Sequence, residues 1–281
     1  MSKLLSLFPT NTSDNIVICV SGIGGNKQNT TLIANSIPDL NILDAGTQCF
    51  PLYYYKEKAT SGPTLFDSGN TNAGQYERKD AITDFILEQC RKQYSPKVTK
   101  EDIFYYVYGL LHSPDYRTAF AADLKKMLPR LPLVEEASDF WAFSKAGRGL
   151  AALHLNYEEQ PPCPEVAVEG ADQGDFHVDK MRFPNKEDKS VLEYNSFITL
   201  RNIPLEAYEY VINGRSAIEW IMERYQVKQD KASGIVNDPN LWAEEHNKPR
   251  CILDLLLSII TVSLETMKIV KGLPRLTFAA S

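Results

Sequence analysis

The chain has 281 residues, of which 43% are hydrophobic and 23% are charged, and its formal net charge is −6. This composition is that of a globular protein and excludes an intrinsically disordered chain, while the length allows one large domain or two closely packed ones. The net negative charge argues against nucleic-acid binding, because phosphate neutralisation by Lys and Arg supplies much of the affinity for DNA.

The charges are unevenly distributed along the chain. Residues 87–130 hold eight basic and five acidic residues, whereas residues 131–179 hold ten acidic residues against only Lys145 and Arg148. A protein that is acidic as a whole can still present a basic face, so nucleic acid stays among the candidate partners.

Five cysteines lie far apart and form no Cys-x-x-Cys pair, and the chain shows no charged and then apolar leader. Reduced thiols and a cytoplasmic location are therefore expected. The most apolar run, residues 251–262, is too short to cross a bilayer and is expected to be a buried helix.

The first predicted elements are strands. Residues 15–21 are apolar and rich in β-branched side chains, and glycines at positions 22, 24 and 25 end this strand in a tight loop. A second strand is predicted at 47–55, with Pro51 at a bulge or an edge position. Residues 61–74 are rich in Gly, Ser, Thr and Asn and predict a loop.

Helices are predicted next. Thr99 can cap a helix that carries one apolar face, and Ser113-Pro114-Asp115 provides a cap, a first-turn proline and a first-turn acid for a second helix that ends before Pro129. Ser138 and the residue after it open a third helix that continues to about residue 153. These three segments predict a helical bundle.

The pattern changes after the prolines at 161, 162 and 164. Alternating residues at 177–183 and 191–200 predict a β-hairpin joined by the charged turn 184–190. Short helices are predicted at 205–212 and 215–225 on either side of Asn213-Gly214, and a long helix runs from Pro249 to Gly272. The expected fold class is α/β, in the α+β sense, with mixed β elements and a helical bundle segment.

The loop after the first strand invites comparison with a phosphate-binding loop. The comparison fails, because Asn26 and Gln28 stand where that motif needs Gly and a hydroxyl residue around Lys27. The same loop can offer Lys27 and Asn29 to DNA, or it can be a polar surface turn.

The predicted hairpin carries a cluster of basic residues, namely Lys180, Arg182, Lys186 and Lys189. A β-ribbon of this kind can enter the major groove of DNA, although charged hairpins are also commonly just solvated. Glu187 and Lys189 form half of a nuclease motif, which needs a further metal-binding carboxylate such as Asp179.

The four histidines show no spacing typical of metal ligands. His112 and His154 lie in apolar helical surroundings and are expected to be packing residues.

Residues 203–240 resemble the C-terminal specificity domain of Type ISP restriction-modification enzymes, single polypeptides that join nuclease, translocase, adenine methyltransferase and DNA target recognition. Further segments are similar to the same family in consistent order, at 46–55, 102–120, 128–133, 181–184, 194–200 and 261–270. The resemblance implies a recognition domain that clamps double-stranded DNA together with an adenine methyltransferase domain. It implies two parts of one module, 1–160 with the strand pair and helical segment and 161–281 with the hairpin and C-terminal helices.

The chain has no Asn-Pro-Pro-Tyr motif, no glycine-rich S-adenosylmethionine loop and no translocase motif. The resemblance therefore implies no catalytic residue, no metal and no cofactor in this chain, with S-adenosylmethionine, ATP and Mg²⁺ bound by other domains of the parent enzyme. The residues expected to contact DNA are Lys27, Asn29, Arg117, Lys145, Arg148, Lys180, Arg182, Lys186, Lys189, Arg215 and Ser216. For Ser216 a second interpretation is open, because it can instead cap the helix that follows.

Two other functions are compatible with the residues. A Mg²⁺-dependent nuclease would use Glu187 and Lys189, and a protein-docking domain would use the acidic segment 131–179 to bind a basic partner.

Overall fold

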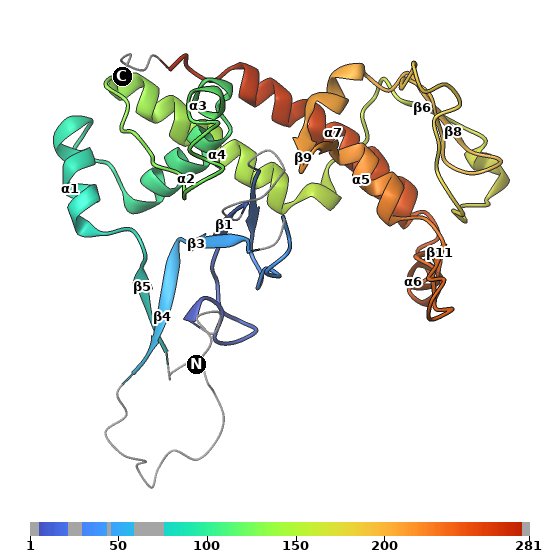
Figure 1. Ribbon diagram of the computed structural model, residues 1–281, viewed down its shortest axis with the longest axis horizontal. Coiled ribbons are helices and arrows are strands. Elements are labelled where there is room, and N and C mark those ends of the chain that lie inside the picture. The colour runs from blue at the N-terminus through green and yellow to red at the C-terminus, as the bar shows by residue number, and fades with distance from the viewer. Residues whose placement is uncertain (1–5, 22–29, 44–45, 59–75, 277–281) are drawn as a thin grey trace, which may run out of the picture. The chain divides into compact units, whose positions relative to one another are not determined.

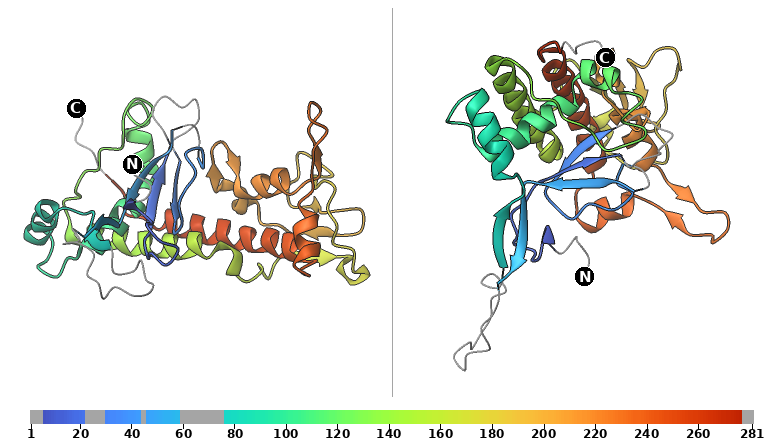
Figure 2. Two further views of the ribbon diagram at one scale, coloured as in Figure 1. Left: turned by 90° about the horizontal axis from the view of Figure 1, so that it is seen from below. Right: turned by 60° about the vertical axis from the view of Figure 1, so that its left-hand side comes forward.

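The computed structural model describes residues 6–21, 30–43, 46–58 and 76–276. The chain divides into two compact units, which we call unit 1 (residues 1–155 with 272–281) and unit 2 (residues 156–271). Figures 1 and 2 show the helices and strands of each unit. Among the described helices, none has the length and apolar character that crossing a membrane requires.

Unit 1 begins with a three-stranded antiparallel sheet. Strand β1 (Val17–Val20) lies between β2 (Thr31–Ala34) and β3 (Gln48–Pro51), and all four of its side chains are buried. Both neighbours pair with it in antiparallel register, with Val17 opposite Ala34 on one side and opposite Pro51 on the other. The predicted strand at 15–21 is confirmed, and Pro51 has an edge position as expected, because β3 is an outer strand of this sheet.

The single strand predicted at 47–55 was wrong, since the chain turns at Leu52 and forms two strands. Strand β4 (Tyr53–Glu57) leaves the first sheet and pairs with β5 (Tyr76–Asp80) as a two-stranded ribbon (Figure 1). The Asn15 side chain explains the break. Its oxygen accepts from the Tyr53 N–H at 3.1 Å and its nitrogen donates to the Tyr53 carbonyl at 2.8 Å, so it takes the place of a strand partner there. The predicted loop 61–74 lies outside the described residues.

Four helices complete unit 1: α1 (Asp84–Gln93), α2 (Lys100–Leu111), α3 (Pro114–Ala119) and α4 (Ala137–Leu155). Thr99 caps α2 in a reciprocal arrangement with Asp102, and Ser113 caps α3, so both predicted caps are confirmed. Helices α2 and α4 meet at Gly109 and Gly147. A β-carbon on Gly147 would lie 1.8 Å from the Tyr105 carbonyl oxygen, so only glycine permits this approach.

The second helix was predicted to reach residue 128 but ends at Ala119. The following residues form turns instead, and the chain then folds back over α3. The Tyr116 hydroxyl donates to the Arg130 carbonyl at 2.9 Å and the Tyr106 hydroxyl to the Pro132 carbonyl at 2.6 Å. These bonds hold residues 130–132 against the helices, which a longer α3 would not allow.

His112 and His154 are buried in unit 1, as expected for packing residues. His112 Nδ1 lies 2.8 Å from the Tyr108 carbonyl oxygen, and His154 Nδ1 lies 2.6 Å from the Tyr108 hydroxyl. Burial lowers the pKa of both rings, to about 3 for His154. Both histidines are therefore neutral in the folded protein at pH 7.

Unit 2 is built around the long helix α7 (Cys251–Lys271), which confirms the final predicted helix. Its buried face packs with the 3₁₀ helix η5 (Leu205–Glu209) and helix α5 (Ala217–Arg224). Unit 2 also contains a small antiparallel sheet, in which β8 (Thr199–Arg201) lies between β6 (Ala167–Glu169) and β7 (Leu192–Glu193). One hydrophobic core joins these elements, with Tyr194, Leu200 and Leu256 among its fully buried members.

The hairpin predicted between 177–183 and 191–200 was wrong. Only a single bridge joins Arg182 to Glu193, and β7 pairs with β8 within the second of the two segments. The Asn240 side chain supplies the reason, because its oxygen accepts from the Val178 N–H at 2.9 Å and its nitrogen donates to the Val178 carbonyl at 3.0 Å. A buried side chain thus takes the backbone groups that a partner strand would need.

The remaining elements of unit 2 are short. Strands β9 (Val211–Ile212) and β10 (Arg215–Ser216) pair across the Asn213-Gly214 turn, and β11 (Lys228–Gln229) pairs with β12 (Val236–Asn237). Helix α6 (Asn240–Glu245) follows. The Asn213-Gly214 turn is confirmed, since both residues have positive φ, but it joins strands rather than helices. The helix predicted at 215–225 begins only at Ala217.

Candidate nucleic-acid interface

Basic residues from three distant parts of the sequence meet on unit 2. Lys180, Arg215 and Lys228 line a shallow hollow of about 340 Å³, which we call the basic hollow. Met181, Met222 and Gln226 line it too, together with the carboxylates of Glu219 and Glu223. Two of the expected DNA contacts, Lys180 and Arg215, are thus brought together by the fold.

Local structure explains how each cation reaches the basic hollow. Arg215 is placed by the tight turn at Asn213-Gly214, in which positive φ reverses the chain between β9 and β10. Lys228 opens β11, and the preceding Val227 N–H donates to the Asp179 carbonyl at 2.9 Å. That bond brings the segment with Lys180 beside the start of the β11–β12 ribbon.

The carboxylates of the basic hollow are already engaged. Glu223 forms an ion pair with Arg215 and lies 3.8 Å from the Lys228 ammonium. Glu219 binds the Lys189 ammonium at 2.8 Å. Burial raises the pKa of Glu219, but the bonds from Lys189 and Ser216 outweigh it and hold that pKa below its usual value. Three cations and two carboxylates therefore line the basic hollow, an excess of one positive charge.

Lys189 and Ser216 both form contacts within the fold of this region, although the Lys189 side chain is partly exposed. The Lys189 ammonium lies over the rings of Phe183 and Tyr208, 5.7 Å and 5.4 Å from their centroids, while it binds Glu219. Ser216 is buried, and it forms a reciprocal cap with Glu219 at the start of α5. For Ser216 the structure therefore supports the capping interpretation.

Arg182 and Lys186 are exposed. Arg182 forms an ion pair with Glu193 and lines a second hollow of about 240 Å³ together with Lys180. Three carboxylates, those of Asp175, Asp179 and Glu193, line this second hollow too. Lys180 lines both hollows.

In unit 1 two arginines lie against the fold. Arg148 bonds to Asp102 at 2.8 Å and its guanidinium lies 4.4 Å from the Tyr105 ring centroid. Arg117 donates from Nε to the Leu111 carbonyl at 2.8 Å. Lys145 is exposed on α4. The two remaining predicted contacts, Lys27 and Asn29, lie outside the described residues.

The nuclease half-motif has no catalytic geometry in the described part of the chain. Lys189 is held by Glu219, and Glu187 is exposed on the 184–190 turn. Among the described residues, no group of three or more His, Cys, Asp or Glu side chains is arranged to hold a metal ion.

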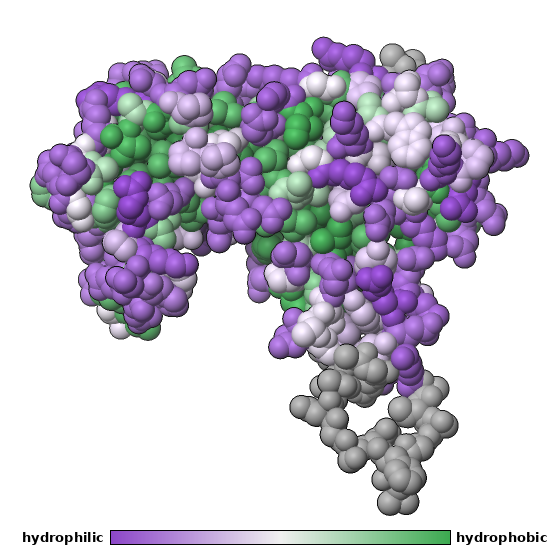
Figure 3. Space-filling model, turned by 180° about the vertical axis from the view of Figure 1, so that it is seen from behind, coloured by the Kyte–Doolittle hydropathy of each residue, from purple (hydrophilic) through white to green (hydrophobic). Residues whose placement is uncertain are grey.

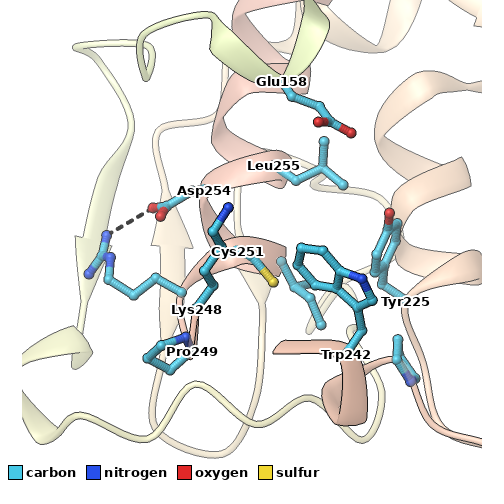
Figure 4. Close-up of a pocket in the computed structure, with 11 residues that line it drawn as sticks. Glu158, Tyr225, Trp242, Lys248, Pro249, Cys251, Asp254 and Leu255 are labelled. Atoms are coloured by element: carbon cyan, nitrogen blue, oxygen red, sulfur yellow. Dashed lines mark hydrogen bonds and ion pairs between the residues drawn. The ribbon is translucent and has the colours of Figure 1, made fainter. Parts of the chain in front are cut away.

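A larger hollow of about 720 Å³ lies elsewhere on unit 2, at the start of α7 (Figure 4). Tyr225 and Trp242 form part of its wall, and two cations, Lys248 and Arg250, are matched by two carboxylates, Glu158 and Asp254. Arg250 bonds to Asp254 at 3.3 Å. This hollow therefore lacks the excess positive charge that the basic hollow has.

Lys228 was not among the residues expected to contact DNA, and the β11–β12 ribbon that carries it was not among the predicted elements. A signal was present, because Asp230 to Gly234 form a turn-rich segment with β-branched residues after it. Residue Lys231 lies in that same turn.

Comparisons with known proteins identify the family. The sequence model of the Type ISP C-terminal specificity domain matches residues 1–255, and the chain belongs to this family. No curated protein matches the chain.

Three solved structures have similar folds. The ATP-dependent Type ISP restriction-modification enzyme LlaBIII bound to DNA is 40% identical over 99% of this chain, with a TM-score of 0.84. A nuclease-deletion mutant of the Type ISP enzyme LlaGI with a DNA substrate mimic is 39% identical over 99% of this chain, with a TM-score of 0.78. The DrdV–DNA complex is 30% identical over 98%, also with a TM-score of 0.78. This chain spans 17%, 23% and 26% of those three chains, respectively.

Proposed function

We propose that this chain recognises a DNA target sequence as the specificity module of a Type ISP restriction-modification enzyme. The observation that carries the proposal is its similarity, over nearly its whole length, to part of a Type ISP enzyme whose structure was solved with DNA. The α+β architecture of the two units agrees with that role.

The basic hollow is the proposed contact with the DNA backbone. Lysine and arginine side chains that neutralise phosphates supply affinity and fix the position of the protein on the duplex, whereas contacts to base edges select the sequence. We assign phosphate contacts first to Lys180, Arg215 and Lys228. Arg182, which shares a second hollow with Lys180, and the exposed Lys186 are further candidates. Arg117, Lys145, Arg148 and Lys189 remain further proposals for phosphate contacts.

An adenine methyltransferase domain of the same enzyme is the proposed partner. The two would clamp the duplex between them in the cytoplasm, and S-adenosylmethionine, ATP and Mg²⁺ would be bound by the enzyme's other domains. The support is that this chain corresponds to about a fifth of the DNA-bound relatives, which leaves most of such an enzyme to other domains.

Binding selection from a pool of randomised duplexes tests the proposal. The chain is used once alone and once with the adenine methyltransferase domain of its parent enzyme, and the bound duplexes are sequenced. One enriched short asymmetric motif is expected. If neither arm enriches a motif, the proposal is wrong.

A charge-reversal variant tests whether the basic hollow is responsible for the enrichment of the motif. Lys180→Glu combined with Lys228→Glu is expected to abolish enrichment, while Lys268→Glu, on an exposed position of α7, leaves it unchanged. Equal enrichment by both variants would show that the basic hollow does not contact DNA, without contradicting target recognition by this chain.

A further inference from the structure

The β11–β12 ribbon exposes apolar side chains at its tip. Ile235 is 68% exposed and Val236 is 52% exposed, although both are β-branched aliphatic residues that are usually buried. The ribbon projects from unit 2 in the views of Figure 2. Figure 3 shows hydrophobic residues among hydrophilic ones on one face of the protein, and Ile235 is among the most exposed large hydrophobic residues of the described chain.

The turn that presents Ile235 is held by several hydrogen bonds. One carboxylate oxygen of Asp230 accepts from the N–H groups of Ala232 and Ser233, at 3.0 Å and 2.7 Å, and from the Ser233 hydroxyl at 2.8 Å. The Asp230 N–H donates to the Ile235 carbonyl at 2.9 Å, and Gly234 has a φ of 72°. A two-stranded hairpin is marginal by itself, so these bonds are what hold Ile235 in one exposed position.

Two lysines flank the apolar tip, and the two carboxylates of the same segment, Asp230 and Asp238, accept hydrogen bonds of the turn and of Asn240. Lys231 lies in the turn, and Lys228 lies at the base of the ribbon, where it lines the basic hollow. Two exposed aliphatic side chains are far too small an area for a stable protein interface, which buries about 800 Å² on each partner. An apolar tip flanked by lysines fits instead a polyanion with an apolar interior, and a DNA duplex with its stacked bases is such a partner.

We infer that Ile235 is an apolar wedge that inserts between neighbouring base pairs of the bound duplex, while Lys228 and Lys231 contact the phosphates on either side. The inference rests on the proposed function. Aliphatic side chains are used in this way by proteins that kink DNA, and the wedge partly unstacks one base step. The free energy of unstacking depends on the sequence, so the wedge adds selectivity for an easily opened pyrimidine–purine step.

Fluorescence of 2-aminopurine tests the wedge, because this adenine analogue brightens when it is unstacked. Duplexes of the selected sequence carry it at one position at a time. The unaltered chain is expected to raise the fluorescence at one step only. Ile235→Ser is expected to remove that rise and to weaken binding by about tenfold, as for loss of one buried aliphatic contact. Ile235→Met keeps an apolar side chain and should keep most of the rise.

Two controls separate the wedge from other effects. Leu205→Ser changes an aliphatic residue that is 62% exposed on η5, away from the ribbon, and should alter neither binding nor fluorescence. Lys231→Ala should weaken binding and reduce the salt dependence while the fluorescence rise at saturation remains. Thermal unfolding of each variant shows that the fold is kept.

The outcomes are distinct. Unchanged affinity and fluorescence for Ile235→Ser would overturn the wedge and leave DNA recognition intact. Loss of binding to the methyltransferase domain, with no fluorescence rise in the unaltered chain, would make the tip a protein contact and also overturn it. If the unaltered chain binds no duplex in either arm of the selection, the proposed function fails first.

Discussion

In unit 1 the arginines expected to contact DNA lie against the fold itself, whereas in unit 2 the basic residues gather around a hollow. Arg148 is matched by Asp102 and Arg117 holds the Leu111 carbonyl, while Lys180, Arg215 and Lys228 come together from three parts of the sequence. We therefore expect the same residue types to have different roles in the two units. Changes in unit 1 should affect mainly stability, and changes in the basic hollow should affect mainly DNA binding.

The strongest test of that division is Gly147→Ala. A β-carbon at this position would lie 1.8 Å from the Tyr105 carbonyl oxygen, so α2 and α4 would have to separate. We expect a loss of about 3 kcal/mol or more in the free energy of unfolding, measured by urea denaturation. Ala142→Ser, at a half-buried site on the same helix, is the control and should change stability by about 0.5 kcal/mol or less. Similar stability for both variants would contradict the close helix contact.

Acid should weaken unit 1 through its buried histidines. Burial lowers the pKa of His154 to about 3 in the folded protein, from an ordinary value of 6.5 in the unfolded chain. Below pH 6.5 the unfolded chain takes up a proton that the folded chain refuses, so stability falls as the pH drops from 6.5 towards 3 and is unaffected by this group above 6.5. The loss from His154 alone is about 2 kcal/mol at pH 5.

Urea denaturation at pH 7 and pH 5 measures this effect. His154→Gln should lower stability at pH 7, because Tyr108 loses its partner, but should reduce the difference between the two pH values. His246→Gln, at an exposed position, is the control and should keep the full difference. A difference that is equally large in His154→Gln would show that other groups cause it.

Lys180→Ala and Lys228→Ala test the other half of the comparison. Each should weaken binding about equally for all DNA sequences and reduce the slope of log affinity against log salt by about 1, because one phosphate contact is lost. Fluorescence anisotropy over a range of salt concentrations provides the measurement, with Lys268→Ala as the matched exposed control. A changed sequence preference with an unchanged slope would instead make these lysines readers of bases.

The smallest effect is expected from Arg148→Ala. Its ion pair with Asp102 and its contact with Tyr105 are partly exposed, so the loss of stability should be about 1 kcal/mol or less. Its effect on DNA affinity should be smaller than that of Lys180→Ala, since its charge is already matched. A larger effect on DNA affinity would show that this face of α4 contacts the duplex. The expected difference in role between the basic residues of the two units would then be wrong.

Local signals predicted the parts of the fold that depend on neighbouring residues. The caps at Thr99 and Ser113, the strand at 15–21, the turn at Asn213-Gly214 and the long C-terminal helix all follow from residues within a few positions of one another. The predictions that failed depend on distant side chains. Asn240 prevents the hairpin at 177–183, and Asn15 breaks the strand after Pro51.

Consecutive residues were enough to specify the family, the α+β class and most of the helices, because motifs, caps and apolar periodicity are local properties of a chain. Which cations share a surface depends on the folded protein, since Lys180, Arg215 and Lys228 meet through one backbone bond and one tight turn. Folding also leaves Ile235 exposed. Burial and ion pairing arise from contacts between distant segments, and residue type and spacing do not specify them.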